Sequence, residues 1–216
     1  MNQAEYSCAP NPQNTIHSES SDDQMKLERI LRIVAHGFEA DAEMNRLRLQ
    51  PFAKCFCNCS NVLDVGCGEG LMLELLRDAG TTAIGVDTDP NKVARARSKG
   101  LEAITVDAHE YLHDKKGGFD GIFLSHIIEH FDGPDAVRLL YLCRRALQPN
   151  GMIIVITPNY MSSDIAMQGF WLDITHRRPY PMLLLQHIFA TLGIAVVECG
   201  VGHMGQEIII AGKVTK

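Results

Sequence analysis

Three carboxylates and three glycines in the first half of the chain are spaced in a way that suits a small, positively charged ligand. Asp64 ends an apolar run and is followed at once by a turn that contains Gly66, Gly68 and Gly70. Glycine permits backbone conformations and close approaches that a Cβ would forbid, so such a turn can bring its backbone against a ligand. Asp87 and Asp107 end the next two apolar runs, AIGVD and AITVD. Because a carboxylate beside the turn repels phosphate, this arrangement favours a ligand that carries an amine.

Three histidines could act as a general base, because an imidazole titrates near neutral pH. His126 ends a fourth apolar run, GIFLSH, and is expected to lie nearest the bound ligand. His130 follows one helical turn later, and Glu129 could orient either ring. His176 lies in a separate segment. The residues leave the choice open, and we favour His176 because a base must contact the molecule that loses the proton.

The segment 168–181 reads QGFWLDITHRRPYP and is too long and too rich in functional groups for a simple connection. Arginine offers two parallel donors to a phosphate or carboxylate, and aromatic rings can cover the apolar face of a sugar. The sequence therefore predicts a substrate-binding loop over 160–181, with six candidate residues: Trp171, Asp173, His176, Arg177, Arg178 and Tyr180. The alternative is that Asp173 pairs with Arg177 and pins the segment, while His176 only fills a gap.

The strands and helices that position these residues can be placed from hydrophobic spacing and helix-end signals. Five strands are predicted over 61–65, 83–87, 103–107, 121–126 and 152–157, with helices over 71–79 and 90–99. Asp132 and Pro134 predict the start of another helix, because Asp is a favoured N-cap and proline is tolerated in the first turn. A helix over 181–192 precedes strands over 195–199 and 207–211, whose short connection requires an antiparallel hairpin. Carboxyl ends of parallel strands share one edge of a sheet, so the carboxylates and histidines are expected to gather there.

The glycines fall as G-x-G-x-G rather than the G-x-G-x-x-G of a dinucleotide site, and the polar strand ends follow in order. In these features residues 62–212 resemble the class I S-adenosylmethionine-dependent methyltransferases. The resemblance implies an α/β fold with a Rossmann-like seven-stranded sheet, parallel except for a C-terminal antiparallel hairpin strand, and helices on both faces. It also implies that the chain is an enzyme with S-adenosylmethionine as its cofactor.

The same resemblance implies roles for the three carboxylates. Asp64 lies near the amino acid end of the cofactor, Asp87 accepts hydrogen bonds from both ribose hydroxyls, and Asp107 holds the adenine amino group. The other cofactor-binding candidates lie in the same turns: Gly66, Cys67, Gly68, Gly70, Thr88, Ala108, Ser125 and His126. The alternative for Asp87 and Asp107 is that each only caps the helix that follows it.

The methyl acceptor is less well defined by the residues. Segment 168–181 resembles the F-x-L-D-P-T-H-x-R-P segment of methyltransferases encoded with polysaccharide and O-antigen assembly enzymes, with Ile174 in place of the proline. This resemblance implies O-methylation of a sugar hydroxyl or a phosphorylated glycan. Two alternatives stay open: methylation of a small metabolite or quinone-like ring, and a non-catalytic cofactor-binding regulatory subunit. Enzymes of this fold that methylate nucleobases carry a different polar and aromatic motif after strand four, and the net charge of −6 disfavours nucleic acid.

The 216 residues fit one domain with appendages. Residues 1–24 are predicted to be a disordered leader, 25–60 to form N-terminal helices that act as a lid, and 61–216 to form the cofactor-binding domain. No stretch of the chain is apolar enough to span a bilayer, which predicts a cytoplasmic protein. The oligomeric state is left open.

The sequence predicts no metal site. Cys55, Cys57 and Cys59 form a C-x-C-x-C run, whereas structural zinc usually requires two-residue spacers and a second pair of ligands. All three would share one face if the run were extended, so the alternative of a metal at these cysteines stays open. Cys67 is expected to be a small packing residue.

Overall fold

The computed structural model describes residues 21–36 and 42–215, which fall into two units, 1–37 and 38–216. The first unit contains α1 (Ser21–His36), whose first turn is acidic and in which Lys26 pairs with Asp22 at 2.8 Å. Residues 21–24 of the predicted leader belong to this helix, and the leader itself stays a prediction. Residues 1–20 lie outside the described residues. The lid role of 25–60 stays a prediction.

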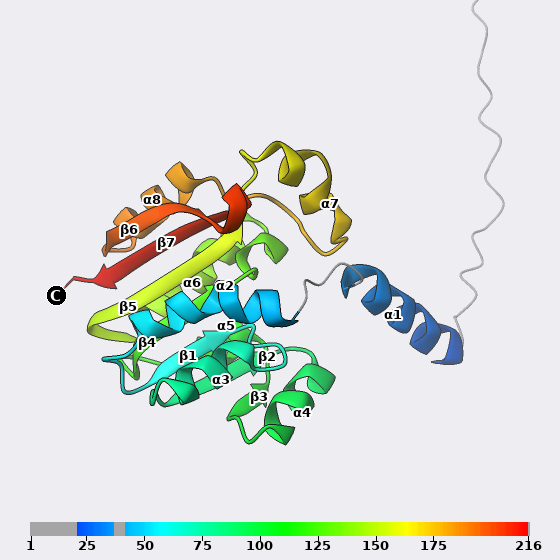
Figure 1. The fold of residues 1–216 in the computed structure, drawn as a ribbon, viewed down its shortest axis with the longest axis horizontal. Helices are drawn as coiled ribbons and strands as arrows, with labels where there is room; N and C mark the ends of the chain where they lie inside the picture. The colour runs from blue at the N-terminus through cyan, green and yellow to red at the C-terminus, as the bar shows by residue number, and fades with distance from the viewer. Residues whose placement is uncertain (1–20, 37–41, 216) are drawn as a thin grey trace, which may run out of the picture. The chain divides into compact units, whose positions relative to one another are not determined.

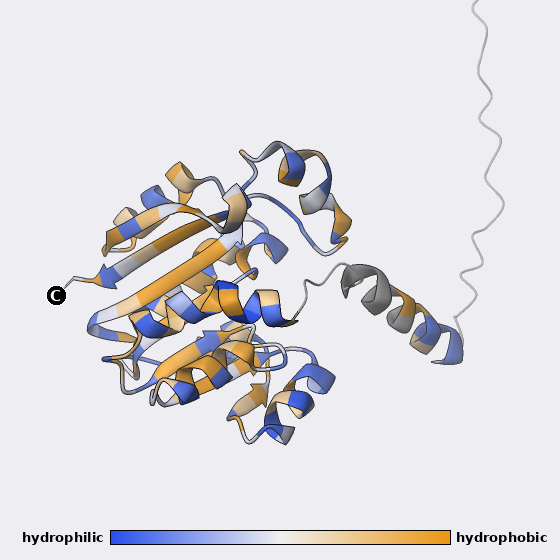
Figure 2. Ribbon diagram, viewed as in Figure 1, coloured by the Kyte–Doolittle hydropathy of each residue, from blue (hydrophilic) through white to orange (hydrophobic). Residues whose placement is uncertain are grey.

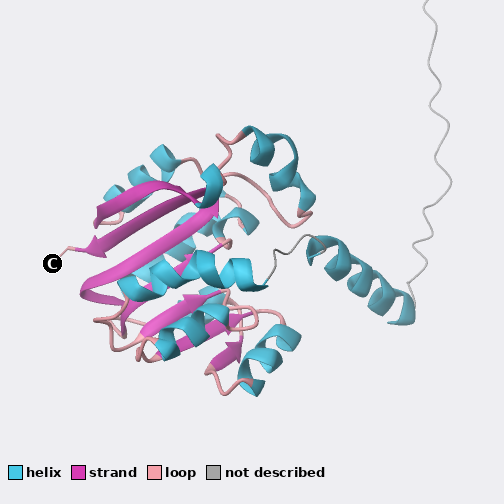
Figure 3. Ribbon diagram, in the orientation of Figure 1, coloured by secondary structure: helices cyan, strands magenta, loops and turns pink. Residues whose placement is uncertain are grey.

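A seven-stranded sheet forms the centre of the second unit, in the order β3-β2-β1-β4-β5-β7-β6 (Figures 1 and 3). The strands are β1 (Val62–Val65), β2 (Ala83–Asp87), β3 (Ala103–Thr105), β4 (Phe119–Ser125), β5 (Leu147–Pro158), β6 (Ile194–Gly202) and β7 (Glu207–Val214). The first five are parallel, and β7 runs antiparallel to both of its neighbours. This confirms the predicted Rossmann-like sheet with its C-terminal hairpin.

Helices cover both faces of this sheet. One face carries α2 (Ala42–Cys55), α3 (Leu71–Asp78) and α4 (Pro90–Ser98), and the other carries α5 (Ala108–Leu112), α6 (Gly133–Ala146) and α8 (Met182–Thr191). Strand residues alternate between the two cores, so that Leu63 and Val65 pack toward α5, α6 and α8 while Val62 packs toward α2 and α3. Figure 2 shows the resulting band of hydrophobic strands between amphipathic helices. Burial on both faces explains why the strands are continuous apolar runs.

Asp residues fix the starts of three helices. Asp89, Asp107 and Asp132 each accept a hydrogen bond from a backbone N–H of the first turn, and proline follows within two residues of Asp89 and Asp132. The cap predicted at Asp132 is therefore confirmed. The capping alternative also holds for Asp107, but for Asp87 it is wrong, because the cap of α4 is Asp89.

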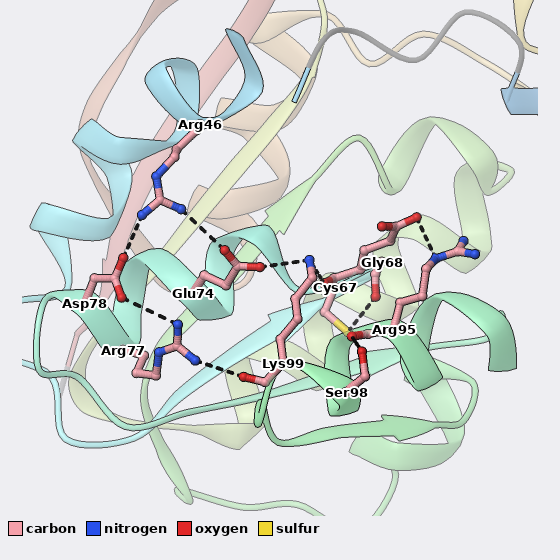
Figure 4. Close-up of polar contacts among 10 residues, drawn as sticks. Arg46, Cys67, Gly68, Glu74, Arg77, Asp78, Arg95, Ser98 and Lys99 are labelled. Atoms are coloured by element: carbon pink, nitrogen blue, oxygen red, sulfur yellow. Dashed lines mark hydrogen bonds and ion pairs between the residues drawn. The ribbon is translucent and has the colours of Figure 1, made fainter. Parts of the chain in front are cut away.

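Ion pairs on the surface connect α2, α3 and the end of α4. Arg46 of α2 lies 2.6 Å from Asp78 and 3.4 Å from Glu74, and Lys99 lies 2.8 Å from the other oxygen of Glu74 (Figure 4). Exposed pairs of this kind contribute at most about 1 kcal/mol each. The helix packing against the sheet depends instead on the buried residues Leu49 and Ala53 of α2.

Two segments differ from expectation. Cys55 ends α2 and Cys57 lies in the following turn, so the cysteine run is not extended. The 160–181 loop contains a π-helical turn (Ile165–Gly169) and a helical turn, α7 (Phe170–Leu172), before it becomes extended. Within the described residues, no helix combines the length and the apolar character that crossing a membrane would require.

Candidate active site

The turn between β1 and α3 contains three glycines with positive φ, namely Gly66 (73°), Gly68 (52°) and Gly70 (83°). A Cβ on Gly66 would lie 1.9 Å from Ile127 Cδ1, and one on Gly70 would lie 2.5 Å from Leu101 Cδ1. Packing within the protein therefore requires these two glycines. A Cβ on Gly68 would meet only Lys92 Cδ among the described residues, at 4.0 Å. Of the three, Gly68 is the position with space beside its backbone, and a ligand at these glycines stays a prediction.

Asp64 lies near the carboxyl end of β1 and is only 3% exposed. Its Oδ2 is fully buried and has no hydrogen-bond partner among the described residues. Burial, and then the negative charge of Asp87, raises the pKa of Asp64 to about 8. A buried carboxylate without a partner is unfavourable, and a ligand ammonium at Oδ2 would supply both the missing donor and the missing charge.

Asp87 ends β2 and is held in place by two backbone groups. Its Oδ2 accepts a hydrogen bond from Gly68 N at 2.9 Å, and its Oδ1 accepts one from Asp89 N at 2.8 Å. The carboxylate thereby fixes the position of the glycine turn and presents two oxygens at the same edge of the sheet. Each oxygen has capacity for a second donor, as two neighbouring hydroxyls would require.

The remaining cofactor candidates lie at the ends of β2, β3 and β4. Asp107 uses Oδ1 to cap α5, whose first residue is Ala108, and Thr88 is exposed beside Asp87. Ser125 ends β4, and its Oγ is buried without a hydrogen-bond partner among the described residues. Cys67 is buried against Gly85, and burial raises the pKa of its thiol, which confirms the expected packing role.

His126 follows β4 in a left-handed backbone conformation with φ 55° and lies between two buried carboxylates. Its Nε2 is 2.6 Å from Glu207 Oε1, and its Nδ1 is 3.2 Å from Glu129 Oε1. Burial lowers the pKa of His126, but its close polar contacts with Glu129 and Glu207 outweigh burial and raise the pKa to about 9. At neutral pH this imidazole is therefore a cation that cannot accept a proton.

Glu129 and Glu207 bring distant parts of the chain to His126. Glu207 begins β7 and also pairs with Arg48 of α2 at 2.5 Å. Glu129 is fully buried, accepts a hydrogen bond from Thr157 Oγ1 at 3.0 Å, and uses its backbone carbonyl to accept one from Arg177 N at 2.8 Å. Burial raises the pKa of both glutamates, but the bonds to His126 outweigh it and hold each pKa below its usual value.

His130 and His176 are neighbours, with ring centroids 4.8 Å apart. His130 Nδ1 lies 2.8 Å from Thr175 Oγ1, and His176 Nδ1 lies 2.7 Å from the carbonyl oxygen of Phe170. Burial, supported by the neighbouring His176, holds the pKa of His130 below its ordinary value. His130 is therefore neutral at pH 7 and able to accept a proton.

The six residues predicted to bind substrate do not form one surface. Trp171 is 55% exposed, and Asp173 accepts hydrogen bonds from Thr175 rather than pairing with Arg177. Tyr180 is 1% exposed, and its hydroxyl donates to the backbone carbonyls of Phe131 and Asp132, so its ring is not an exposed surface for a sugar; its role in substrate binding stays a prediction. The guanidinium of Arg178 lies 5.1 Å from the centre of the Tyr180 ring.

A separate cavity of about 360 Å³ lies between α6 and α8. Arg178, Tyr180 and His187 line it together with apolar residues of the two helices. His130 and His176 are not among the residues that line this cavity. Two of the predicted substrate residues, Arg178 and Tyr180, therefore line a cavity that the histidine pair does not line.

Three residues of this site were not predicted from the sequence: Arg48, Thr175 and Glu207. Glu207 precedes the apolar run IIIA, and a glutamate that begins a buried strand is a weak signal that its charge has a partner. Arg48 and Thr175 carry no such signal. Each reaches the site only through the packing of α2 or of the 160–181 loop.

Glu129, His130 and His176 each offer one ligand atom, and these atoms lie within 4.8 Å of one another. The described residues thus contain a group with the chemistry of a metal site, at a place where the sequence predicted none. No cysteine belongs to this group.

Comparison with known proteins finds a match to the family model described as "Methyltransferase domain" over residues 27–199. A ubiquinone biosynthesis O-methyltransferase of Xanthomonas campestris pv. campestris (strain B100) is 28% identical over 171 residues, covering 73% of this chain and 70% of the relative. A second such enzyme, from Xylella fastidiosa (strain M23), is 33% identical over 123 residues, covering 54% of this chain and 49% of the relative.

Solved structures show the same fold. A SAM-dependent methyltransferase from Archaeoglobus fulgidus superimposes with a TM-score of 0.74 at 25% identity, covering 86% of this chain and 99% of that one. The 1,6-didemethyltoxoflavin-N1-methyltransferase of Burkholderia thailandensis, solved with 1,6-didemethyltoxoflavin and S-adenosylhomocysteine, gives 0.67 at 15% identity, covering 97% and 94%.

Proposed function

Because this chain belongs to the methyltransferase-domain family and is an S-adenosylmethionine-dependent methyltransferase, we propose that it methylates a hydroxyl group on a small, quinone-like aromatic ring. The observation that carries this proposal is the imidazole of His130, which follows β4 and packs against His176 of the 160–181 loop, whose ring in turn packs against Phe170. Burial holds the pKa of His130 below its ordinary value, so this imidazole is neutral at pH 7. The relatives described above are named as O-methyltransferases of ubiquinone biosynthesis, which supports a ring hydroxyl over a sugar.

On the donor side, Asp64 is the proposed partner of the cofactor's ammonium group. Its Oδ2 is buried without a partner among the described residues, and burial together with the charge of Asp87 raises its pKa, which a ligand cation would offset. Asp87, fixed by Gly68 N, is the proposed acceptor of the ribose hydroxyls, and Asp107 with Ala108 is proposed to hold the adenine. When bound, S-adenosylmethionine supplies an electrophilic methyl group on a positively charged sulfur.

On the acceptor side, a phenolic hydroxyl must lose its proton as oxygen takes the methyl group, because its pKa is near 10. His130 is the proposed base, since its pKa is lowered and it is uncharged at neutral pH. His126 cannot serve, because two carboxylates hold it in the cationic form. This assignment replaces the preference for His176 that the sequence suggested.

The polysaccharide acceptor suggested by segment 168–181 has less support. The printed names of the relatives refer to ubiquinone biosynthesis, and the geometry removes Tyr180 from the set of exposed aromatic residues. Arg178 lines a cavity away from His130. A non-catalytic subunit is disfavoured by the placement of a neutral base among groups that fix its position.

The test is methyl transfer from labelled S-adenosylmethionine to a panel of catechols, hydroxyquinols, nucleotide sugars and phosphorylated glycans. We expect label in the phenolic compounds, and a fall of about 10²- to 10⁴-fold in kcat for His130→Asn. His187→Asn is the matched control, because His187 lines the other cavity. Labelling of sugars alone would reject the proposed acceptor, and full activity of His130→Asn would reject the proposed base.

A further inference from the structure

We propose that Thr175 and Asp173 are positioning residues that fix His130 in the tautomer with its proton on Nδ1, so that Nε2 is left to accept the acceptor's proton. This inference rests on the proposed function of His130. The three side chains come from two segments of the chain, since His130 ends the turn after β4 while Asp173 and Thr175 belong to the 160–181 loop.

Donors and acceptors can be assigned from the distances. Thr175 Oγ1 lies 2.6 Å from Asp173 Oδ1 and 2.8 Å from His130 Nδ1. An ionised carboxylate can only accept, so the hydroxyl proton of Thr175 points to Asp173. The oxygen of that hydroxyl can then only accept from His130, which places the imidazole proton on Nδ1. The lone pair of the neutral ring therefore lies at Nε2.

The ionised state of Asp173 is supported by its surroundings. Burial alone would raise its pKa, but the hydrogen bonds from the hydroxyl and backbone N–H of Thr175 outweigh it and hold the pKa below its usual value. His176 contributes in the same direction, with its Nε2 at 3.8 Å from Asp173 Oδ2. The carboxylate is therefore charged whenever the enzyme is at neutral pH.

The ring of His130 is also held in orientation. It contacts the ring of His176 edge to face, and His176 is itself fixed by donating from Nδ1 to the carbonyl of Phe170 at 2.7 Å. The titratable groups that act on His130 are Glu129, His176 and Asp173. When His130 takes up a proton, the chain through Thr175 to Asp173 places a negative charge behind the new imidazolium.

The substitution that tests this chain is Thr175→Val, with Thr175→Ser as the matched variant that retains the hydroxyl. We expect kcat to fall about 10- to 100-fold in Thr175→Val, as it does when a metal-bound imidazole loses the group that hydrogen-bonds its second nitrogen. The acidic limb of the pH–rate profile should move to lower pH, because the imidazolium loses its support. Thr175→Ser should keep kcat and the acidic limb of the pH–rate profile near their parental values. Cofactor affinity measured by calorimetry should stay at the parental value in both variants.

The tautomer can be read directly in the unsubstituted protein from long-range ¹H–¹⁵N spectra of the His130 ring. Protonation at Nδ1 supports the inference, and protonation at Nε2 overturns it even if Thr175→Val fails to fold. Loss of activity in His130→Asn with full activity in Thr175→Val would overturn the positioning role of Thr175 and Asp173 but leave His130 as the proposed base. Activity abolished by a chelator and restored by Zn²⁺ or Mg²⁺ would overturn both roles, since Glu129, His130 and His176 would then act as metal ligands.

Discussion

The two halves of the sheet edge are built in different ways. On the donor side, after β2 and β3, the carboxylates are held by backbone within the same part of the chain: Asp87 by Asp89 N and Gly68 N, two and 19 residues away, and Asp107 by His109 N. On the acceptor side, after β4 and β5, the partners are remote: Arg48 and Glu207 are 159 residues apart, and His126 and Glu207 are 81 apart. A local turn can bind a constant cofactor, while contacts between distant segments let the acceptor side change without altering the donor side.

The largest effect is expected from breaking the acceptor side at Glu207. Glu207→Gln removes the charge that Arg48 and His126 share, and leaves two cations near each other in a partly buried site. We expect the free energy of unfolding in urea to fall by about 3–5 kcal/mol. Glu198→Gln, on an exposed part of β6, is the control and should change it by less than about 0.5 kcal/mol. If Glu207→Gln lost no more unfolding free energy than the control, the contacts of Glu207 with Arg48 and His126 would not be stabilising.

A substitution on the donor side should instead lower the affinity for the cofactor. Asp87→Ala removes the carboxylate that holds Gly68 N and that is proposed to bind the ribose. Loss of a charged hydrogen bond of about 1.5–3 kcal/mol should weaken binding of S-adenosylhomocysteine roughly 10- to 100-fold in calorimetry. Asp89→Ala is the control, because it removes the cap of α4 but keeps the backbone N–H that holds Asp87. Equal affinities of the two variants would contradict the assignment of Asp87.

One contact joins the two sides, and it offers a sharper test of their independence. Gly66→Ala would place a Cβ 1.9 Å from Ile127 Cδ1, so we expect a loss of about 1–3 kcal/mol in unfolding free energy and weaker cofactor binding. Adding Ile127→Ala removes the colliding carbon and should recover part of the loss. Strictly additive effects in this double-mutant cycle would show that the two sides are not coupled here.

The smallest effect concerns pH. The folded-state pKa of His126 is raised to about 9 from its ordinary 6.5, so its contribution to stability is complete below pH 6.5 and is lost as pH rises through 9. The side chain is 37% exposed, so solvent screening should limit this contribution to about 1 kcal/mol. The pKa of Asp64 is raised to about 8, so the contribution of Asp64 to the stability of the folded protein also declines as pH rises. Thermal melts of His126→Gln should therefore show a smaller decline from pH 7 to 10 than the parent, and identical declines would contradict the shift.

The contrast between the two sides also explains what the sequence could predict. The strands, the helix starts at Asp132 and Pro134, and the carboxylates of the donor side follow from local patterns that need only neighbouring residues. Glu207 looks like any glutamate beside an apolar run, and its role exists only because β7 inserts between β5 and β6. The burial of Tyr180 was not predicted, for a related reason. An aromatic residue in a polar segment can face inward, and here its hydroxyl meets two backbone carbonyls in the core.

The insertion of β7 has a consequence for the order of events during synthesis. The donor side needs residues only up to α5, whereas His126 acquires its second carboxylate when Glu207 has been translated, 81 residues later. Because chains grow from the N-terminus, the early strands and their glycine turn can begin to fold before the acceptor side can close. A nascent chain would then meet S-adenosylmethionine with a donor half in place and no means of transferring the methyl group. Ligand bound at that stage would act as a folding template for the N-terminal strands, and activity would appear only when the final hairpin enters the sheet.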